Sequence, residues 1–300
     1  MVEIAREAAA LGCCVEQNVP LSRLTSFRVG GPADYMITAP ETAVSALLKK
    51  LKEERVPVLI LGNGSNLLVS DRGFRGVVLK IAPPKEPVLR KGDELYTGAG
   101  LSLKQLCLTA QREGLSGLEP LYGIPGTVGG AVFMNAGAYG GEIADTLREV
   151  AVTDGSGQVT AVPSADAALG YRHSRFMETG EVILSAVFAL TPDDPARIRE
   201  RMEEYMRRRR EKQPLEYPSA GSFFKRPEGH FAGELIDRCG LRGLSVGGAQ
   251  ISEKHAGFLI NRGGASCRDI LELSETVCRI VREKTGVQLE REVQMVGETL

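Results

Sequence analysis

Three polar side chains stand where they could take part in a reaction. Ser222 lies between a glycine and two phenylalanines, and a serine hydroxyl in such a dry pocket could donate a proton. Arg172 lies in the partly apolar run 171–176, and a guanidinium group suits bidentate binding of a carboxylate. Glu292 lies in the alternating run 289–293. For each residue alone, the simpler explanation is structural: a turn serine, a surface arginine and a solvent-facing acid.

A glycine-rich loop could place backbone N–H groups against an anion. Leu61-Gly62-Asn63-Gly64-Ser65-Asn66 follows an apolar run, and its glycines would let the backbone close on a group such as a pyrophosphate. The dinucleotide fingerprint G-x-G-x-x-G is not met, because Leu67 stands at the third glycine and no helix is expected next. A plain turn after a strand is the equal alternative.

A second glycine-rich segment is harder to explain as a turn. Residues 123–131 (GIPGTVGGA) combine glycines and a proline with apolar residues, which suggests that their backbone lies against a flat ligand. Residues 135–140 have the same glycine-rich composition. The structural alternative is a tightly packed glycine corner.

Residues 243–247 match the G-x-S-x-G hydrolase pattern, but a glycine follows instead of a helix, so we ascribe this match to chance.

Histidine and cysteine offer little for a metal site. The chain has three histidines and no H-E-x-x-H motif, so no metal cofactor is expected. His255 could be a ligand or a general acid, although a lone histidine is more often structural. Six cysteines without a C-x-x-C pair indicate reduced cytosolic thiols.

Apolar periodicity predicts the elements that must position these residues. Longer helices are expected over 41–55, 102–114, 195–210 and 266–286, and a short helix is expected to end at Cys239. Ser102 and Gln105 form a capping box at the start of the second of these helices. Strands are expected at 58–61, at 77–81, in short runs over 147–190 and at 287–296, whereas 115–141 shows no helical period. This order predicts an α+β protein of three units.

The composition is that of an ordinary globular protein. A length of 300 residues allows about two domains, and a net charge of −1 gives no electrostatic case for nucleic-acid or anionic-membrane binding. No apolar run approaches the length of a membrane span, and the first residues lack the pattern of a signal peptide. We therefore expect a cytoplasmic protein, and no obligate protein partner is inferred.

Together and in this order, these segments resemble the UDP-N-acetylenolpyruvoylglucosamine reductase family, the flavoenzymes of peptidoglycan precursor synthesis. A series of this kind is specific, whereas any one segment alone would not be. The matching segments cover nearly the whole chain: 18–33, 59–68, 117–140, 170–176, 221–227, 235–261 and 289–293.

The resemblance implies a vanillyl-alcohol-oxidase-type FAD-binding fold of two α+β subdomains, followed by a smaller α+β substrate domain. We expect FAD-binding subdomains at 1–84 and 85–212 and a substrate-binding domain at 213–300, whose C-terminal strand could return to the FAD domain. The resemblance also implies non-covalent FAD, NADPH as the hydride donor, and reduction of an enolpyruvyl ether to the lactyl ether of UDP-N-acetylmuramate.

The resemblance further implies roles for particular residues. Arg172 and Glu292 would stabilise the negative charge that hydride addition develops on the substrate carboxylate, and Ser222 would protonate the α-carbon. Substrate or NADPH contacts are expected at Tyr139, Tyr171, Lys212, Arg226 and His255. FAD contacts are expected at Leu61, Gly62, Asn63, Gly64, Ser65, Asn66, Gly123, Ile124, Pro125, Gly126, Thr127, Gly129, Gly130, Ala131 and Gly137, with 123–132 as a strand–loop along the flavin.

The chain departs from some family members in two places. Arg226 stands where some members have asparagine, and the stretch 177–220 is too short for the tyrosine-bearing loop that closes over the substrate in others. Two other functions fit the same residues less well. A related FAD oxidase acting on an alcohol or sugar would differ in the acceptor of the reduced flavin, and a nucleotide-sugar-binding regulator would not need Arg172, Ser222 and Glu292.

Overall fold

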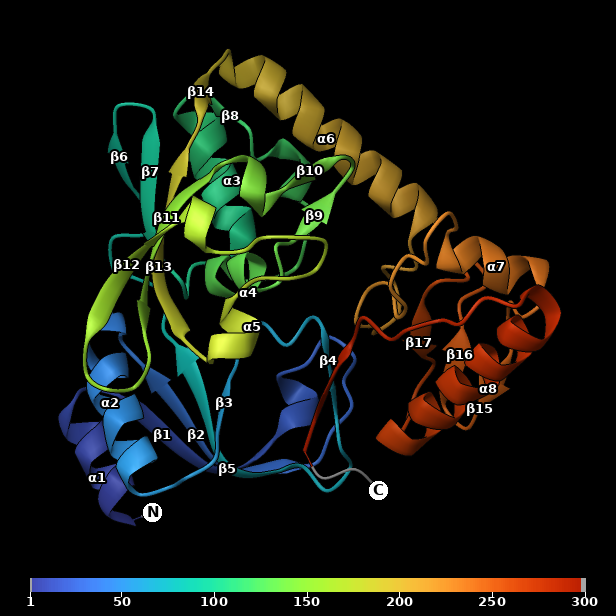
Figure 1. Ribbon diagram of the computed structural model, residues 1–300, viewed down its shortest axis with the longest axis horizontal. Helices are drawn as coiled ribbons and strands as arrows, with labels where there is room; N and C mark the ends of the chain where they lie inside the picture. The colour runs from blue at the N-terminus through green and yellow to red at the C-terminus, as the bar shows by residue number, and fades with distance from the viewer. Residues whose placement is uncertain (1, 298–300) are drawn as a thin grey trace. The chain divides into compact units, whose positions relative to one another are not determined.

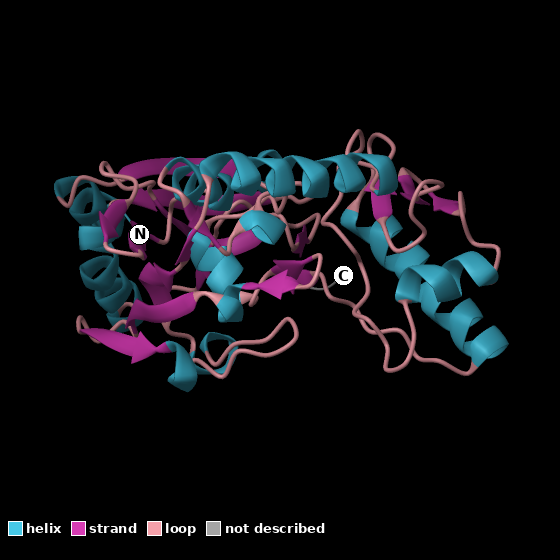
Figure 2. Ribbon diagram, turned by 90° about the horizontal axis from the view of Figure 1, so that it is seen from above, coloured by secondary structure: helices cyan, strands magenta, loops and turns pink. Residues whose placement is uncertain are grey.

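The computed structural model describes residues 2–297, and the chain divides into two compact units (Figure 1). Of the described residues, unit 1 holds 2–17, 35–63 and 76–208, and unit 2 holds 18–34, 64–75 and 209–297. Both units contain helices and strands (Figure 2). Both units are therefore α+β, as the sequence predicts.

A five-stranded antiparallel sheet in the order β12-β11-β13-β7-β6 forms one part of unit 1. Helix α4 contacts β7 and β13, and α3 contacts α4. The elements of this part are β6 (Leu89–Lys91), β7 (Glu94–Gly98), α3 (Leu103–Arg112), α4 (Val128–Phe133), β11 (Leu147–Thr153), β12 (Val159–Pro163), α5 (Phe176–Thr179) and β13 (Val182–Ala189).

A four-stranded sheet in the order β1-β2-β5-β3 forms the other part of unit 1. Its strands are β1 (Cys14–Pro20), β2 (Pro32–Ala39), β3 (Val58–Ile60) and β5 (Phe74–Ile81). The helices of this part are α1 (Val2–Ala10) and α2 (Glu41–Glu53). Two short ladders pair β8 (Leu115–Ser116) with β14 (Thr191–Pro192) and β9 (Gly137–Ala138) with β10 (Gly141–Glu142). Strands β1, β2 and β5 and helix α6 (Pro195–Lys212) continue into unit 2.

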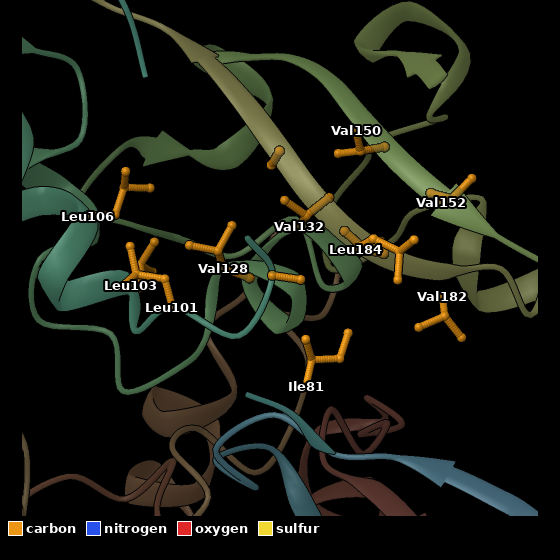
Figure 3. Packing of buried hydrophobic residues seen from close by; sticks show 14 of the residues in the cluster. Ile81, Leu101, Leu103, Leu106, Val128, Val132, Val150, Val152, Val182 and Leu184 are labelled. Carbon is orange, nitrogen blue, oxygen red and sulfur yellow. The ribbon is translucent and has the colours of Figure 1, made fainter. Parts of the chain in front are cut away.

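One apolar cluster forms the core of unit 1. Val128 and Val132 from α4 pack in it with Leu184 of β13, and all three side chains are buried (Figure 3). Burial of such side chains supplies the main stabilisation of a core, on the order of 1.5–3 kcal/mol each. The core therefore fixes α4, which contains the end of the second glycine-rich segment.

Unit 2 has a separate core around helix α8, which contacts β15 and β16. Its elements are β4 (Leu67–Val69), α7 (Ala232–Arg238), β15 (Ser245–Val246), β16 (Ala249–Ile251), β17 (Leu259–Asn261), α8 (Cys267–Thr285) and β18 (Gln294–Val296). Strands β15, β16 and β17 form an antiparallel sheet, and β18 pairs in parallel with β4. Within residues 2–297 no helix is long and apolar enough to cross a membrane.

Helices with capping signals lie where the sequence predicts them. Ser266 caps α8 in a full capping box with Asp269, and Gly286 ends this helix in the left-handed conformation. Asp194 accepts a hydrogen bond from Ala196 N–H at the start of α6. The capping box predicted at Ser102 is only half present, because the Gln105 side chain contacts the Ser102 hydroxyl rather than its backbone.

One prediction of secondary structure is wrong, and another is confirmed only in part. Residues 115–141 were expected to lack a helix, yet 128–133 form α4, and the flavin strand–loop predicted at 123–132 therefore ends in a helix. The strand predicted at 287–296 is a regular strand only as β18, and before it the backbone makes a single bridge at Arg291.

The first 40 residues also hold elements that the periodicity does not indicate. Helix α1 buries only a narrow stripe that includes Ile4 and Ala8. Strand β1 is an edge strand with mostly exposed side chains, so it shows no apolar alternation. Both elements depend on tertiary packing that a local pattern does not reveal.

Candidate active site

The first glycine-rich loop meets the start of α4 within unit 1. A Cβ at Gly62 would lie 2.7 Å from the hydroxyl oxygen of Thr127, which is closer than real Cβ atoms come. Thr127 in turn caps α4 by accepting a hydrogen bond from Gly130 N–H at 3.3 Å. The structure therefore brings together two segments that the sequence assigns to FAD.

The glycines of the second segment are of two kinds. A Cβ at Gly129 would lie 2.8 Å from Ala99 Cβ, so this glycine is required by the packing of α4. A Cβ at Gly126 would meet no described atom within 4 Å, and one at Gly130 would touch only the Thr127 hydroxyl at 3.4 Å. Neither has the positive φ that favours glycine. Gly126 and Gly130 thus leave room on the protein surface, which fits a flat ligand lying against them.

Arg172 lies in a two-residue turn of unit 1. Gly170 and His173 exchange both backbone hydrogen bonds at 3.1 Å, and Arg172 between them has a φ of +54°. Its guanidinium donates to Gly137 O at 3.0 Å and lies 5.4 Å from the ring centre of Tyr171, itself 54% exposed. The turn therefore presents an aromatic ring and a guanidinium side by side.

The second arginine of this run has a different role. Arg175 donates to both carboxylate oxygens of Glu181, at 2.8 and 3.0 Å. The Arg175 guanidinium holds the pKa of the Glu181 carboxyl below its ordinary value, against the effect of burial. Because this bidentate pair occupies Arg175, the sequence hypothesis of carboxylate binding rests on Arg172.

Tyr139 lies at the tip of the β9–β10 ladder. Tyr139 and Gly140 have positive φ values of 55° and 85°, as the two central residues of a tight hairpin turn require. The Tyr139 ring stacks on Tyr205 of α6, with centres 5.1 Å apart and planes at 19°. The same ladder carries Gly137, whose carbonyl accepts from Arg172.

Ser222 and Glu292 lie on neighbouring extended segments of unit 2. Phe223 N–H donates to Gly257 O at 2.9 Å, and Glu292 N–H donates to Phe223 O at 2.9 Å. Single bridges link Ser222 with Phe258 and Phe224 with Arg291. Ser222 is exposed and Glu292 is half-buried. Two of the predicted catalytic residues are thus placed together by backbone hydrogen bonds.

The second half of the first glycine loop joins these segments. Gly64 has a φ of +58°, and its carbonyl accepts from Ser26 N–H at 3.1 Å. The Ser26 hydroxyl donates to Ser219 O at 2.6 Å. The Asn66 amide donates to Glu292 O at 3.2 Å, and Gln294 N–H donates to Asn66 O at 3.0 Å. Asn66 thereby holds the backbone of Glu292.

His255 is half-buried in unit 2, and burial lowers its pKa below the ordinary value of 6.5. Gly257 N–H donates to its Nδ1 at 3.1 Å, and its ring packs edge-on against Phe258 at 4.9 Å. The positive charge of Lys212, which is exposed, also lowers the pKa of His255. Burial therefore disfavours protonation of His255, and its Nδ1 already accepts a hydrogen bond.

Arg226 and Ser245 of the G-x-S-x-G match are exposed residues of unit 2. The Arg226 guanidinium lies 4.3 Å from the ring centre of Phe231, which is 55% exposed. Ser245 of the match begins β15 and donates to Gly243 O at 3.0 Å, with no helix after it. The structure thus bears out the interpretation of this match as chance. Among the described residues, no group of three or more metal-ligating side chains is present.

Sequence reasoning missed Asn135 as a residue of this site. Its side chain is fully buried, and it lies two residues before strand β9. Only its place in the run 135–140 drew attention to it, and no local pattern reveals a hydrogen-bond partner 35 residues away in the sequence.

Comparisons with known proteins agree with this arrangement. A family model described as "FAD binding domain" matches residues 32–162, and one described as "UDP-N-acetylenolpyruvoylglucosamine reductase, C-terminal domain" matches 213–296. The chain is 47% identical over 285 residues to the UDP-N-acetylenolpyruvoylglucosamine reductase of Clostridium novyi (strain NT), covering 95% of this chain and 92% of the relative. It is 43% identical over 290 residues to that of Lactobacillus delbrueckii subsp. bulgaricus (strain ATCC BAA-365 / Lb-18), covering 96% and 97%.

A solved structure extends the likeness to the fold. The crystal structure of UDP-N-acetylenolpyruvylglucosamine reductase from Thermus caldophilus matches with a TM-score of 0.82 and 40% identity, covering 95% of this chain and all of that one. The predicted α+β fold class, an FAD-binding fold followed by a smaller C-terminal domain, is thereby confirmed. The chain belongs to the UDP-N-acetylenolpyruvoylglucosamine reductase family.

Proposed function

We propose that this protein is an FAD-dependent oxidoreductase that reduces UDP-N-acetylglucosamine enolpyruvate to UDP-N-acetylmuramate, with NADPH as the hydride donor. The observation that carries the proposal is family membership over 95% of the chain at 47% identity. The product is a peptidoglycan precursor, and we infer a cytoplasmic reaction. The UDP-sugar and NADPH are the partners proposed for the site.

The residues present fit FAD. We assign Leu61–Asn66 to the pyrophosphate, and Gly123–Ala131 with Gly137 to the flavin. The contact between Gly62 and Thr127 and the open faces of Gly126 and Gly130 support this assignment. When bound, FAD supplies the hydride that converts the enolpyruvyl ether to the lactyl ether.

Arg172 is assigned to the substrate carboxylate. Hydride addition at the β-carbon leaves negative charge on the carboxylate as an enolate, and a guanidinium already in position stabilises that charge. The bond from Arg172 to Gly137 O fixes one edge of the guanidinium, which supports its role as a preorganised group. Glu292 is assigned to assist Arg172 in this step.

Ser222 is assigned to protonate the α-carbon as the general acid. The hydroxyl proton passes to the enolate carbon, and the resulting serine alkoxide is then reprotonated from solvent. The exposure of Ser222 supports access of the substrate, and its flanking backbone bonds restrict where the hydroxyl can move.

The remaining assignments concern substrate and NADPH binding and domain boundaries. We assign Tyr139, Tyr171, Lys212, Arg226 and His255 to contacts with the UDP-sugar or NADPH, and the exposed Tyr171 ring supports a stacking role there. We also propose FAD-binding subdomains at 1–84 and 85–212 and a substrate-binding domain at 213–300.

An anaerobic absorbance titration tests the function. NADPH should bleach the flavin band, and UDP-N-acetylglucosamine enolpyruvate should restore it. Bleaching without recovery would keep the flavoprotein fold but assign the reaction to another acceptor. A colourless protein that takes up no added FAD would overturn the proposal.

A further inference from the structure

The carboxamide of Asn135 joins two backbone segments of unit 1. Its Nδ2 donates to Gly170 O at 2.9 Å, and its Oδ1 accepts from Ala144 N–H at 2.9 Å. The side chain is 0% exposed, and its backbone has a φ of +40°. A buried amide costs free energy unless both ends are paired, and both ends of Asn135 are.

Gly170 O is also the acceptor that closes the turn carrying Arg172. It receives His173 N–H at 3.1 Å as well as the Asn135 amide at 2.9 Å. One residue beyond the turn, the buried Ser174 donates its hydroxyl to Phe133 O at 2.7 Å. The turn is thus held at both ends by side chains that bond to backbone carbonyls.

The arginine side chain is held by the same stretch of chain that carries Asn135. Its guanidinium donates to Gly137 O, two residues after Asn135. Asn135 therefore fixes the base of the Arg172 turn relative to the strand that receives the tip of the Arg172 side chain. Removing the amide would let these two ends move independently.

We propose that Asn135 is a positioning residue for Arg172, an inference that rests on the proposed function. An arginine that stabilises charge on a substrate carboxylate must be held before the charge appears. A misplacement of about 1 Å lowers a reaction rate by about 100-fold. Loss of Asn135 should therefore slow the reaction with the enolpyruvyl substrate and leave flavin reduction by NADPH unchanged.

Two substitutions separate the amide from its surroundings. Asn135→Gly keeps the positive φ without strain and removes both hydrogen bonds. Asn135→Asp keeps the size and, when ionised, loses the donor to Gly170 O and places a buried negative charge against that carbonyl. When protonated, the aspartic acid again has a donor for Gly170 O, and burial favours this protonated form. The activity of the Asn135→Asp variant should therefore rise as pH falls. Thr97→Val is the matched control, since it removes a buried hydroxyl bond to Pro87 O elsewhere in unit 1.

The experiment combines single-turnover kinetics with hydrogen exchange of the holoenzyme. Asn135→Gly should slow flavin reoxidation by UDP-N-acetylglucosamine enolpyruvate by about 10- to 100-fold, with flavin reduction unchanged. The amides of the peptide 168–176, which include His173 N–H, should exchange faster in Asn135→Gly and not in Thr97→Val. If Asn135→Gly does not fold, Ser174→Ala should show the same pattern with a smaller effect, because it releases the other end of the turn.

Two outcomes would overturn the inference. One is wild-type reoxidation in both Asn135 variants. The other is an equal loss in both half-reactions without faster exchange at 168–176, since this would mark general damage to the flavin site. Failure of the wild-type protein itself to be reoxidised by the enolpyruvyl substrate would instead refute the proposed function.

Discussion

The Arg172 turn of unit 1 and the Ser222 segment of unit 2 are held in place in different ways. Buried side chains add to the backbone bonds that close the turn, through the bonds from Asn135 to Gly170 O and from Ser174 to Phe133 O. Backbone groups hold the Ser222 segment, through the bonds that Phe223 makes with Gly257 and Glu292.

This difference predicts how each region responds to mutation. A backbone hydrogen bond does not depend on the identity of the side chain, so Ser222 and Glu292 can be replaced without moving their segments. The Arg172 turn depends on particular buried side chains, so it is sensitive to residues that never touch a substrate. Substitutions of Ser222 and Glu292 should therefore report on chemistry alone, whereas substitutions in the Arg172 turn should report on chemistry and placement together.

Ser222→Ala should have the largest effect. Removing a general acid lowers a rate by about 100- to 10,000-fold, and only the half-reaction with the enolpyruvyl substrate should be affected. Flavin reduction by NADPH and the melting temperature should match the wild type. Stopped-flow absorbance measures both half-reactions, and Ser245→Ala, in the chance G-x-S-x-G match, is the control. Wild-type turnover of Ser222→Ala would refute the role of Ser222.

Arg172→Lys should slow the same half-reaction by about 100- to 1,000-fold, because an ammonium cannot reproduce the guanidinium geometry. Arg175→Lys is the matched control in the same run: it weakens the pair with Glu181, so it should lower the melting temperature and keep turnover. Steady-state kinetics and thermal melts distinguish the two variants. The opposite pattern would place the carboxylate at Arg175.

Two glycine substitutions sharpen the view of unit 1. Gly126→Ala fills open space, so it should weaken FAD binding by on the order of tenfold and leave the apoprotein's stability unchanged. Gly129→Ala would place a Cβ 2.8 Å from Ala99 Cβ, so it should destabilise the apoprotein by about 1–3 kcal/mol. Flavin fluorescence titration and urea unfolding measure these effects. Equal destabilisation of the apoprotein by both would show that Gly126 is only a packing residue.

The sequence predicts elements that carry their own local signals. Helix α8 begins at a capping box and ends at a glycine, and both signals lie within a few residues of the ends. Helix α4 was missed because Gly129 and Gly130 lower its helix propensity, although Gly129 is what lets α4 approach Ala99. The alternation at 289–293 predicts an extended backbone correctly, but its pairing depends on partners 60 or more residues away.

The candidate site was predicted by resemblance more than by local chemistry. Ser222 and Glu292 are ordinary residues in sequence, and the structure alone places them on adjoining segments. Their chemical roles remain predictions. Asn135 could not be found from the sequence, because a buried amide is recognised by its partners and these are set by the fold.

The smallest expected effect is a pH dependence of opposite sign in the two units. Burial lowers the pKa of His255 in unit 2, whereas the Glu178 carboxylate and the Ala168 carbonyl raise the pKa of His173 in unit 1. As pH falls through the ordinary value of 6.5, an unfolded chain takes up a proton at His255 that the folded chain resists, so unit 2 loses stability. The folded chain binds a proton at His173 more readily, so unit 1 gains stability as pH falls from the raised pKa toward 6.5 and loses it as pH rises through the raised pKa.

Two asparagine variants test this difference. His255→Asn keeps an acceptor for Gly257 N–H without titrating, so it should reduce the loss of unfolding free energy between about pH 7.5 and about pH 5.5. His173→Asn removes the gain in unit 1, so it should enlarge that loss. Urea unfolding of the apoprotein at both pH values measures the change. If His255→Asn kept the wild-type pH dependence, the imidazole would titrate alike in the folded and unfolded chain. Burial of His255 would then contribute nothing to the pH dependence of unfolding. The stability of unit 2 would not depend on the charge state of this side chain.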